Sequence, residues 1–295
     1  MHTQIGLTRE DVAGFEEAPD GSRILLADIA YLKLSIVNAI FCGSPTAGDG
    51  SWVLVDTGLP TSAETIAQTA ERRFSARSRP EAIVLTHGHF DHSGSAETLA
   101  ARWDVPVYAH PLEHPYLNGG ASYPPADPWV GGGTFSLLSP LFPRKPIDLG
   151  DRLKSLPSDG SVPGIPEWSW IHTPGHAPGH ISLWRERDRT LIAGDAVITT
   201  GQESAYEVLT QTPEMHGPPR YFTIDWLAAE ASVTALARLE PERIISGHGP
   251  PLSGPNMRSA LWKLSDNFQQ VAVPREGKYV AKRAAADDDS AYRSP

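Results

Sequence analysis

The sequence predicts one domain of mixed α/β structure, and three observations support this prediction. Short apolar runs of strand length alternate with segments whose apolar residues recur at helical spacing. The composition is that of a globular protein, with 40% hydrophobic and 20% charged residues among 295. No internal repeat or clear linker divides the chain. We therefore expect an N-terminal lead-in over 1–22, the domain over 23–275 and a flexible C-terminal tail over 276–295, where small and charged residues dominate.

The first half of the domain is typical of strands followed by strand–helix units. A Gly- and Pro-rich turn at 43–50 separates the first strands from the next one. Apolar residues spaced three and four apart then mark two amphipathic helices. The elements expected here are strands over 23–42 and 51–56, a helix after 61, a strand over 82–85, a helix over 96–103 and a strand over 105–110.

Residues 118–146 form a long stretch that is rich in Gly and Pro. A loop of this length in a compact domain is usually a lid, a binding loop or disordered, and its aromatic residues argue against disorder. Tyr123, Trp129 and Phe135 either line a substrate pocket or merely anchor the loop.

The second half returns to short strands and ends in helices. Strands are expected over 169–172, 180–184, 190–195 and 243–246, and an irregular stretch covers about 200–221. A helix before the last of these strands carries Ile224, Leu227, Ala231 and Leu239 on one side. A final helix is expected over about 256–271.

Charge and composition exclude several classes of function. The net charge of −10 disfavours a nucleic-acid partner, which needs a basic face. Cys42 is the only cysteine, so neither an intrachain disulfide nor a thiolate metal cluster is expected. The apolar run 23–42 is interrupted by Asp28 and Lys33 and is not typical of a membrane span. No export signal is recognisable, so we expect a cytoplasmic protein; the sequence does not indicate its oligomeric state.

The segment "LTHGHFDHSG", residues 85–94, concentrates metal-ligand side chains directly after a buried strand. His87, His89 and Asp91 share one parity and so point to one side of an extended backbone, and His92 opens the next helix. A lone histidine would more often be a packing residue. Four such side chains in this arrangement favour a metal site.

Four further strand ends deliver the same residue types. Asp56, His176, Asp195 and His248 each follow a short apolar run and a turn. His180, which continues a strand, is interpreted instead as a packing residue or as a hydrogen-bond partner of a ligand.

In this order, "VDTG", "THGHFDH", "TPGHAPGH", "AGDA" and "SGHG" resemble the metallo-β-lactamase superfamily over roughly residues 25–250. The resemblance implies a four-layer αββα sandwich with two divalent metal ions at the edge of its two sheets. It implies a first metal held by His87, His89 and His176, a second held by Asp91, His92 and His248, and Asp195 bridging both. Asp56 corresponds to an aspartate that orients ligands without being one.

The resemblance also implies the chemistry. Imidazole and carboxylate ligands suit Zn²⁺, our first choice, as well as Fe²⁺, Mn²⁺ and Co²⁺. Two such ions would generate a bound hydroxide and polarise a carbonyl oxygen, with Asp91 and Asp195 as the catalytic carboxylates. The motif wording is nearest to the lactonase and glyoxalase II branches. We therefore expect hydrolysis of a small-molecule lactone, ester or thioester.

Three alternatives stay open at this point. The same fold hosts β-lactam hydrolysis, phosphodiesterase or nuclease activity, and a mono-iron persulfide dioxygenase. The chain departs from the acyl-homoserine lactonases, which have a tyrosine shortly after the bridging aspartate, because none occurs between Asp195 and Tyr206. It departs from glyoxalase II in having only a short helix, with Arg258 and Lys263, in place of a basic helical domain.

Overall fold

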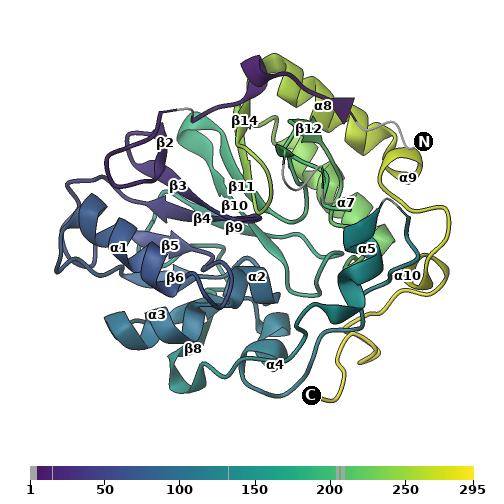
Figure 1. Ribbon diagram of the computed structural model, residues 1–295, viewed down its shortest axis with the longest axis horizontal. Coiled ribbons are helices and arrows are strands. Elements are labelled where there is room, and N and C mark those ends of the chain that lie inside the picture. The colour runs from purple at the N-terminus through teal and green to yellow at the C-terminus, as the bar shows by residue number, and fades with distance from the viewer. Residues whose placement is uncertain (1–4, 15, 132, 204–205, 207–209) are drawn as a thin grey trace.

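Two β-sheets pack face to face, and helices cover the outer face of each sheet (Figure 1). The computed structural model describes residues 5–14, 16–131, 133–203, 206 and 210–295. The larger sheet has the strand order β2-β3-β4-β5-β6-β7-β8 and the smaller one β14-β13-β11-β10-β9. The four-layer αββα sandwich is thus confirmed.

The first sheet uses the chain up to residue 155, and its second half is parallel. Strands β2 to β5 pair antiparallel, whereas β5, β6, β7 and β8 pair parallel, with Val55 opposite Val84. The ends of β5 and β6 therefore meet at one edge of the sheet. The strands are β2 (Arg23–Leu26), β3 (Ile29–Leu34), β4 (Val37–Cys42), β5 (Val53–Val55), β6 (Ala82–Val84), β7 (Val107–Ala109) and β8 (Leu153–Ser155).

The second sheet is built from residues 169–253. Its central strands β11 and β13 are parallel, with Gly194 opposite Ser246, so their ends also lie side by side. The strands are β9 (Ser169–His172), β10 (Ile181–Arg185), β11 (Thr190–Gly194), β13 (Arg243–Ser246) and β14 (Leu252–Ser253); β1 (Ile5–Gly6) and β12 (Glu214–Met215) form a separate pair.

Three apolar clusters hold the layers together. One packs the helices α1 (Ala63–Phe74) and α3 (Ala96–Trp103) on the first sheet, and another packs α7 (Trp226–Arg238) and α8 (Gly254–Asp266) on the second. The third lies between the sheets, where Val55 and Val84 meet Ile192 and Ile245. The remaining α-helices of the described residues are short: α2 (Phe90–Ser93), α4 (His114–Leu117), α5 (Thr134–Leu138), α9 (Phe268–Val271) and α10 (Lys278–Ala281).

The C-terminal segment 276–295 differs from the flexible tail that its composition predicts. Its small residues are what allow it to pack: Ala284 and Ala291 are buried together with Ile224 and Tyr279. The hydroxyl of Tyr116 donates a hydrogen bond to the carbonyl of Ala291. The segment thereby covers the region around residues 112–123.

The long stretch 118–146 contains α5 and is partly buried. Ala126 and Val130 pack with Tyr221 and Phe222, while Trp129, Leu137, Leu138 and Leu141 are exposed. In the described part of the chain, no helix is long and apolar enough to cross a membrane. A cytoplasmic location stays a prediction.

Candidate metal centre

The first half of the site is carried by the adjacent parallel strands β5 and β6. Asp56 follows β5, and its positive φ of 59° turns the chain away from the sheet. His87 and His89 follow β6, and His92 lies within α2, which starts directly after His89. All four side chains are buried.

The second half is carried by the other sheet. Asp195 follows β11 and His248 follows β13, so the parallel pairing of these strands places the two side chains together. His176 lies in the turn between β9 and β10. The site therefore lies at the edge where the two sheets meet.

The structure brings together all seven side chains that the sequence singles out as ligands. They form three overlapping groups in which the ligand atoms lie within 4.8 Å of one another. The groups are His87 with His89 and His176, His87 with His92 and Asp195, and Asp91 with His92 and His248.

Asp195 lies at the centre of the cluster. Its Oδ2 atom is 3.1 Å from Nε2 of His248, 3.4 Å from Nε2 of His92 and 3.5 Å from Nε2 of His176. Nε2 of His248 is also 3.5 Å from Oδ2 of Asp91. One carboxylate thus faces histidines of both predicted metal groups, as a bridging ligand requires.

Several buried polar atoms of the cluster have no hydrogen-bond partner in the described part of the chain. They are Nε2 of His87, Nε2 of His92 and Oδ1 of Asp195. Buried polar atoms are almost always satisfied, so such atoms converging on one point indicate a ligand that they share. Imidazole nitrogens and a carboxylate without sulfur suit a divalent metal ion, so the residues fit the expected cofactor.

Asp56 and His180 fix the orientation of this cluster. Oδ2 of Asp56 accepts a hydrogen bond from Nδ1 of His92 at 2.8 Å, which turns Nε2 of that ring toward the centre. Nε2 of His180 accepts from the backbone N–H of Asp195 at 2.8 Å. Gly194 lets the chain approach this ring closely, because a Cβ there would lie 2.6 Å from Nε2 of His180 at a φ of +54°. His180 is thus a hydrogen-bond partner, one of the two roles predicted for it.

Burial and neighbouring charges shift the pKa values of the cluster in opposite directions. Burial, then the neighbouring histidines, lower the pKa of His87 and of His89 well below the usual value, so both rings are neutral, the form that binds metals. Burial also opposes the charged form of His92, but Asp195, Asp56 and Asp91 outweigh it and raise its pKa. The carboxylates thus attract positive charge to this half of the site.

Glu113 is a buried residue of the site that the sequence analysis missed. Its Oε2 accepts a hydrogen bond from the backbone N–H of Gly88 at 2.9 Å, and its Oε1 accepts from that of Gly179 at 2.7 Å. Tyr123 donates its hydroxyl proton to the same carboxylate. Glu113 thereby joins the loop of His87 and His89 to the loop that follows His176. The one feature of the sequence that could have indicated Glu113 is its position shortly after the strand Val107–Ala109.

Aromatic side chains pack beside the ring of His89. Phe222 stacks on the His89 ring with centroids 4.7 Å apart, and Tyr123 lies against the same ring at 4.1 Å. Phe135 contacts Phe142, which in turn contacts Phe222. Trp129, in contrast, is 78% exposed. Phe222 was missed because it lies just beyond an irregular stretch without periodicity.

Comparisons with known proteins match this fold and site. A family model described as the metallo-beta-lactamase superfamily matches residues 33–248. The probable metallo-hydrolase YflN of Bacillus subtilis is 48% identical over 259 residues, covering 88% of this chain and 95% of that protein. Hydroxyacylglutathione hydrolase of Bdellovibrio bacteriovorus is 31% identical over 126 residues, covering 43% and 38%.

Solved structures share the fold at low sequence identity. A metallo-beta-lactamase family protein from Thermus thermophilus has a TM-score of 0.57 at 20% identity, covering 83% of this chain and 81% of that one. The fold and the site together define the class of protein: the chain belongs to the metallo-β-lactamase superfamily. Within it, the chain is a metallo-hydrolase whose His/Asp clusters are suited to divalent metal ions.

Proposed function

We propose that this chain is a dinuclear hydrolase of carbonyl compounds, acting on a small-molecule lactone, ester or thioester with Zn²⁺ as its metal. The observation that carries the proposal is the position of Asp195, whose Oδ2 lies 3.1–3.5 Å from histidines of both metal groups. A carboxylate between two sets of imidazoles suits two ions that share one bridging ligand.

In this proposal the seven side chains divide into two sets. His87, His89 and His176 hold one ion, Asp91, His92 and His248 hold the other, and Asp195 serves both. Ions held by these residues would supply Lewis acidity toward the carbonyl oxygen and would lower the pKa of water. Because hydrolysis needs no redox chemistry, Zn²⁺ is preferred over Fe²⁺, Mn²⁺ and Co²⁺.

The residues of this chain would then bind, orient and shield the substrate. Asp91 is 7% exposed and adjoins His248, so it is placed to accept a proton at the surface of the cluster. Phe222 presents an apolar ring next to His89, which suits an acyl chain better than a polyanion. Phe135 of α5 contacts Phe142, which contacts Phe222, so α5 is linked to this apolar surface.

Among lactones, esters and thioesters, the thioester is the proposed substrate that a similar protein also supports. The relative named hydroxyacylglutathione hydrolase shares 31% identity over 126 residues with this chain, and an acyl group on the thiol of glutathione is a thioester. That relative is covered over only 38% of its length, so lactones and simple esters belong in the same test.

The proposal is tested by metal analysis combined with a substrate panel. Protein purified without chelator and supplemented with Zn²⁺ should bind two ions per chain and hydrolyse a lactone, ester or thioester. One ion per chain after supplementation with zinc, iron or manganese would refute the dinuclear site. Turnover restricted to β-lactams or phosphodiesters, or uptake of oxygen with a persulfide, would refute the carbonyl ester assignment.

A further inference from the structure

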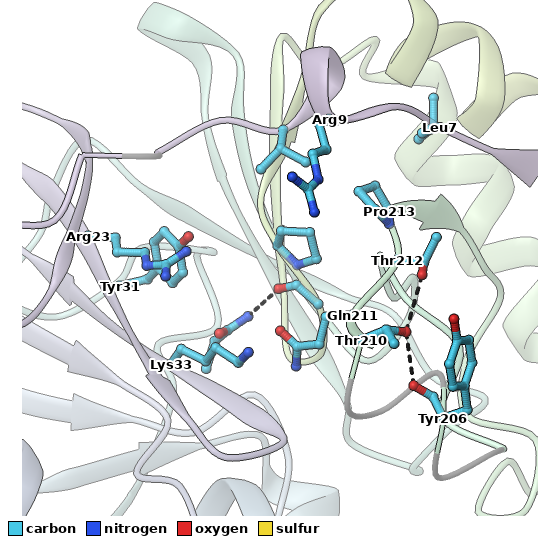
Figure 2. Close-up of a pocket in the computed structure, with 14 residues that line it drawn as sticks. Leu7, Arg9, Arg23, Tyr31, Lys33, Tyr206, Thr210, Gln211, Thr212 and Pro213 are labelled. Atoms are coloured by element: carbon cyan, nitrogen blue, oxygen red, sulfur yellow. Dashed lines mark hydrogen bonds between the residues drawn. The ribbon is translucent and has the colours of Figure 1, made fainter.

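A pocket lies between the N-terminal segment, strands β2 and β3, and the chain that follows His248 (Figure 2). Its volume is about 820 Å³, which is enough for a small organic molecule. Figure 2 shows Arg9, Arg23 and Lys33 on the side of β2, β3 and the N-terminal segment, facing the segment Thr210–Pro213. The residues that line it are Leu7, Arg9, Val12, Arg23, Tyr31, Lys33, Asn38, Tyr206, Thr210, Gln211, Thr212, Pro213, Gly249 and Pro250.

The charge of this lining is the opposite of the charge of the whole chain. Three side chains are cationic, and among the described residues that line the pocket there is no aspartate or glutamate, although the chain carries a net charge of −10. Within the described structure, Arg9, Arg23 and Lys33 form no ion pair within 4.0 Å. Burial, and then the charge of Arg23, lower the pKa of Lys33.

Neutral polar groups complete the lining. The hydroxyl of Thr210 donates a hydrogen bond to the carbonyl of Tyr206 at 2.9 Å and lies 3.2 Å from the hydroxyl of Thr212, so the amide of Gln211 is the neutral group that can donate to a ligand. Cations together with an amide donor are groups that bind carboxylate and phosphate oxygens.

The pocket is joined to the metal centre by two short connections. Asn38 pairs with Lys33 across β3 and β4, and its Nδ2 donates to the carbonyl of Gly249 at 2.8 Å, directly after His248. The turn of the same hairpin holds the His248 ring, because Nδ1 of His248 lies 2.6 Å from the carbonyl of Ile36. A ligand in this pocket therefore lies against the backbone that carries a proposed metal ligand.

We propose that this pocket binds the anionic group, a carboxylate or a phosphate, of a small molecule. The anion has two possible sources. It is either one end of the hydrolysed substrate, a case that rests on the proposed function, or a separate ligand. Arg9 and Lys33 provide most of its recognition, because both side chains are exposed to the pocket and free of carboxylate partners.

The first experiment measures binding without turnover. Phenylphosphonate, a dianion that has no ester to hydrolyse, is titrated calorimetrically into the metal-loaded wild type and into the double variant Arg9→Gln/Lys33→Met. Loss of two charge-assisted contacts should weaken binding about tenfold or more. The matched control Arg77→Gln/Lys154→Met removes the same charge from exposed residues outside the pocket and should bind like the wild type.

Metal content and thermal unfolding are measured for all three proteins. When these agree, phosphonate binding at the metals is the same in each protein, and a difference in affinity reports on the pocket. Equal affinity of the wild type and the pocket variant overturns the proposal, as does an equal loss in the control variant. Because this readout needs no turnover, a failure of the proposed hydrolase activity would not be mistaken for a failure of the pocket.

A second experiment distinguishes the two sources of the anion. Two esters are compared that differ only in a terminal carboxylate or a terminal neutral amide. If the pocket binds one end of the substrate, the pocket variant raises KM for the carboxylate ester only. If the anion is a separate ligand, both esters behave alike while phenylphosphonate binding is still lost.

Discussion

Asp56 acts on the cluster through hydrogen bonds to its neighbours. Its Oδ1 and Oδ2 accept from the backbone N–H and the hydroxyl of Thr86, each at 2.8 Å, and Oδ2 also accepts from Nδ1 of His92. In Asp56→Asn one oxygen becomes an NH₂ group, which then faces a donor, either Nδ1–H of His92 or the backbone N–H of Thr86. We expect metal affinity to fall about 10- to 100-fold, as is typical when such a partner is lost.

A competition titration with a chelating dye measures this loss. The exposed Asp49→Asn variant serves as control, and circular dichroism should show that both variants keep their secondary structure. An Asp56→Asn protein with unchanged affinity would show that Asp56 does not orient His92.

Glu113 gives a second prediction at the scale of single residues. Burial raises its pKa to about 7, yet both of its oxygens accept backbone hydrogen bonds. In Glu113→Gln one oxygen is replaced by an NH₂ group, which faces the backbone N–H of Gly88 or of Gly179. Two donors then face each other in a buried position, which should lower the free energy of unfolding by about 1–3 kcal/mol.

Tyr123→Phe is the matched comparison. It leaves both backbone contacts of Glu113 and removes a hydroxyl that donates to Glu113 and accepts from the backbone N–H of Gly88 at 2.8 Å. We expect a smaller loss of stability in urea unfolding and near-normal metal affinity. If Tyr123→Phe lowers metal affinity as much as Glu113→Gln, the backbone contacts of Glu113 are not what positions the loops.

At the scale of elements, the spacing of apolar residues predicted where helices occur more accurately than it predicted which side of each helix is buried. The helix before 243 is present as α7, but Leu227 is 69% exposed and Ala231 is exposed, whereas Val233 and Leu236 are buried. Apolar residues occur all around this helix, so the pattern alone could not select its inner face. In α3 the two large apolar residues, Leu99 and Trp103, lie on one side with Ala96 and Ala100, and all four are buried.

The exposed leucines of α5 make a prediction about the long stretch 118–146. Leu137 and Leu138 are 59% and 50% exposed, so the double variant Leu137→Ser/Leu138→Ser should leave the melting temperature nearly unchanged. If this surface contacts the acyl group, the variant should raise KM for long-chain esters and not for acetyl esters. An equal effect on both chain lengths would exclude that contact.

At the scale of the whole molecule, the cluster connects the two sheets. His87, His89, Asp91 and His92 belong to the first sheet, while His176, Asp195 and His248 belong to the second. The four ligands of the first sheet could be grouped from the sequence, because they are close neighbours that follow one strand. Only the family resemblance combined them with the other three, since local patterns do not say which distant strand ends meet. Glu113 escaped for the same reason, because its partners Gly88 and Gly179 lie far from it in the chain.

Ions held between the sheets should stabilise the fold. Bound metal at 100 times its Kd adds about 2.7 kcal/mol to the free energy of unfolding, which corresponds to a melting temperature higher by about 5 °C or more. Calorimetry before and after chelation, with zinc added back, measures this change. A melting temperature that does not respond to metal would mean that the cluster does not link the sheets through ions.

The division of the chain between the sheets has a consequence for how the protein can be cut. Every strand of the first sheet precedes residue 156 and every strand of the second follows residue 168, with the exposed turn at Ser158 and Asp159 between them. Cleavage in that turn yields two fragments, each with one sheet and an incomplete set of ligands. Neither fragment alone could bind both ions. Hydrolysis recovered on mixing them would then report reassembly, which makes this chain a candidate for a split enzyme whose complementation depends on metal.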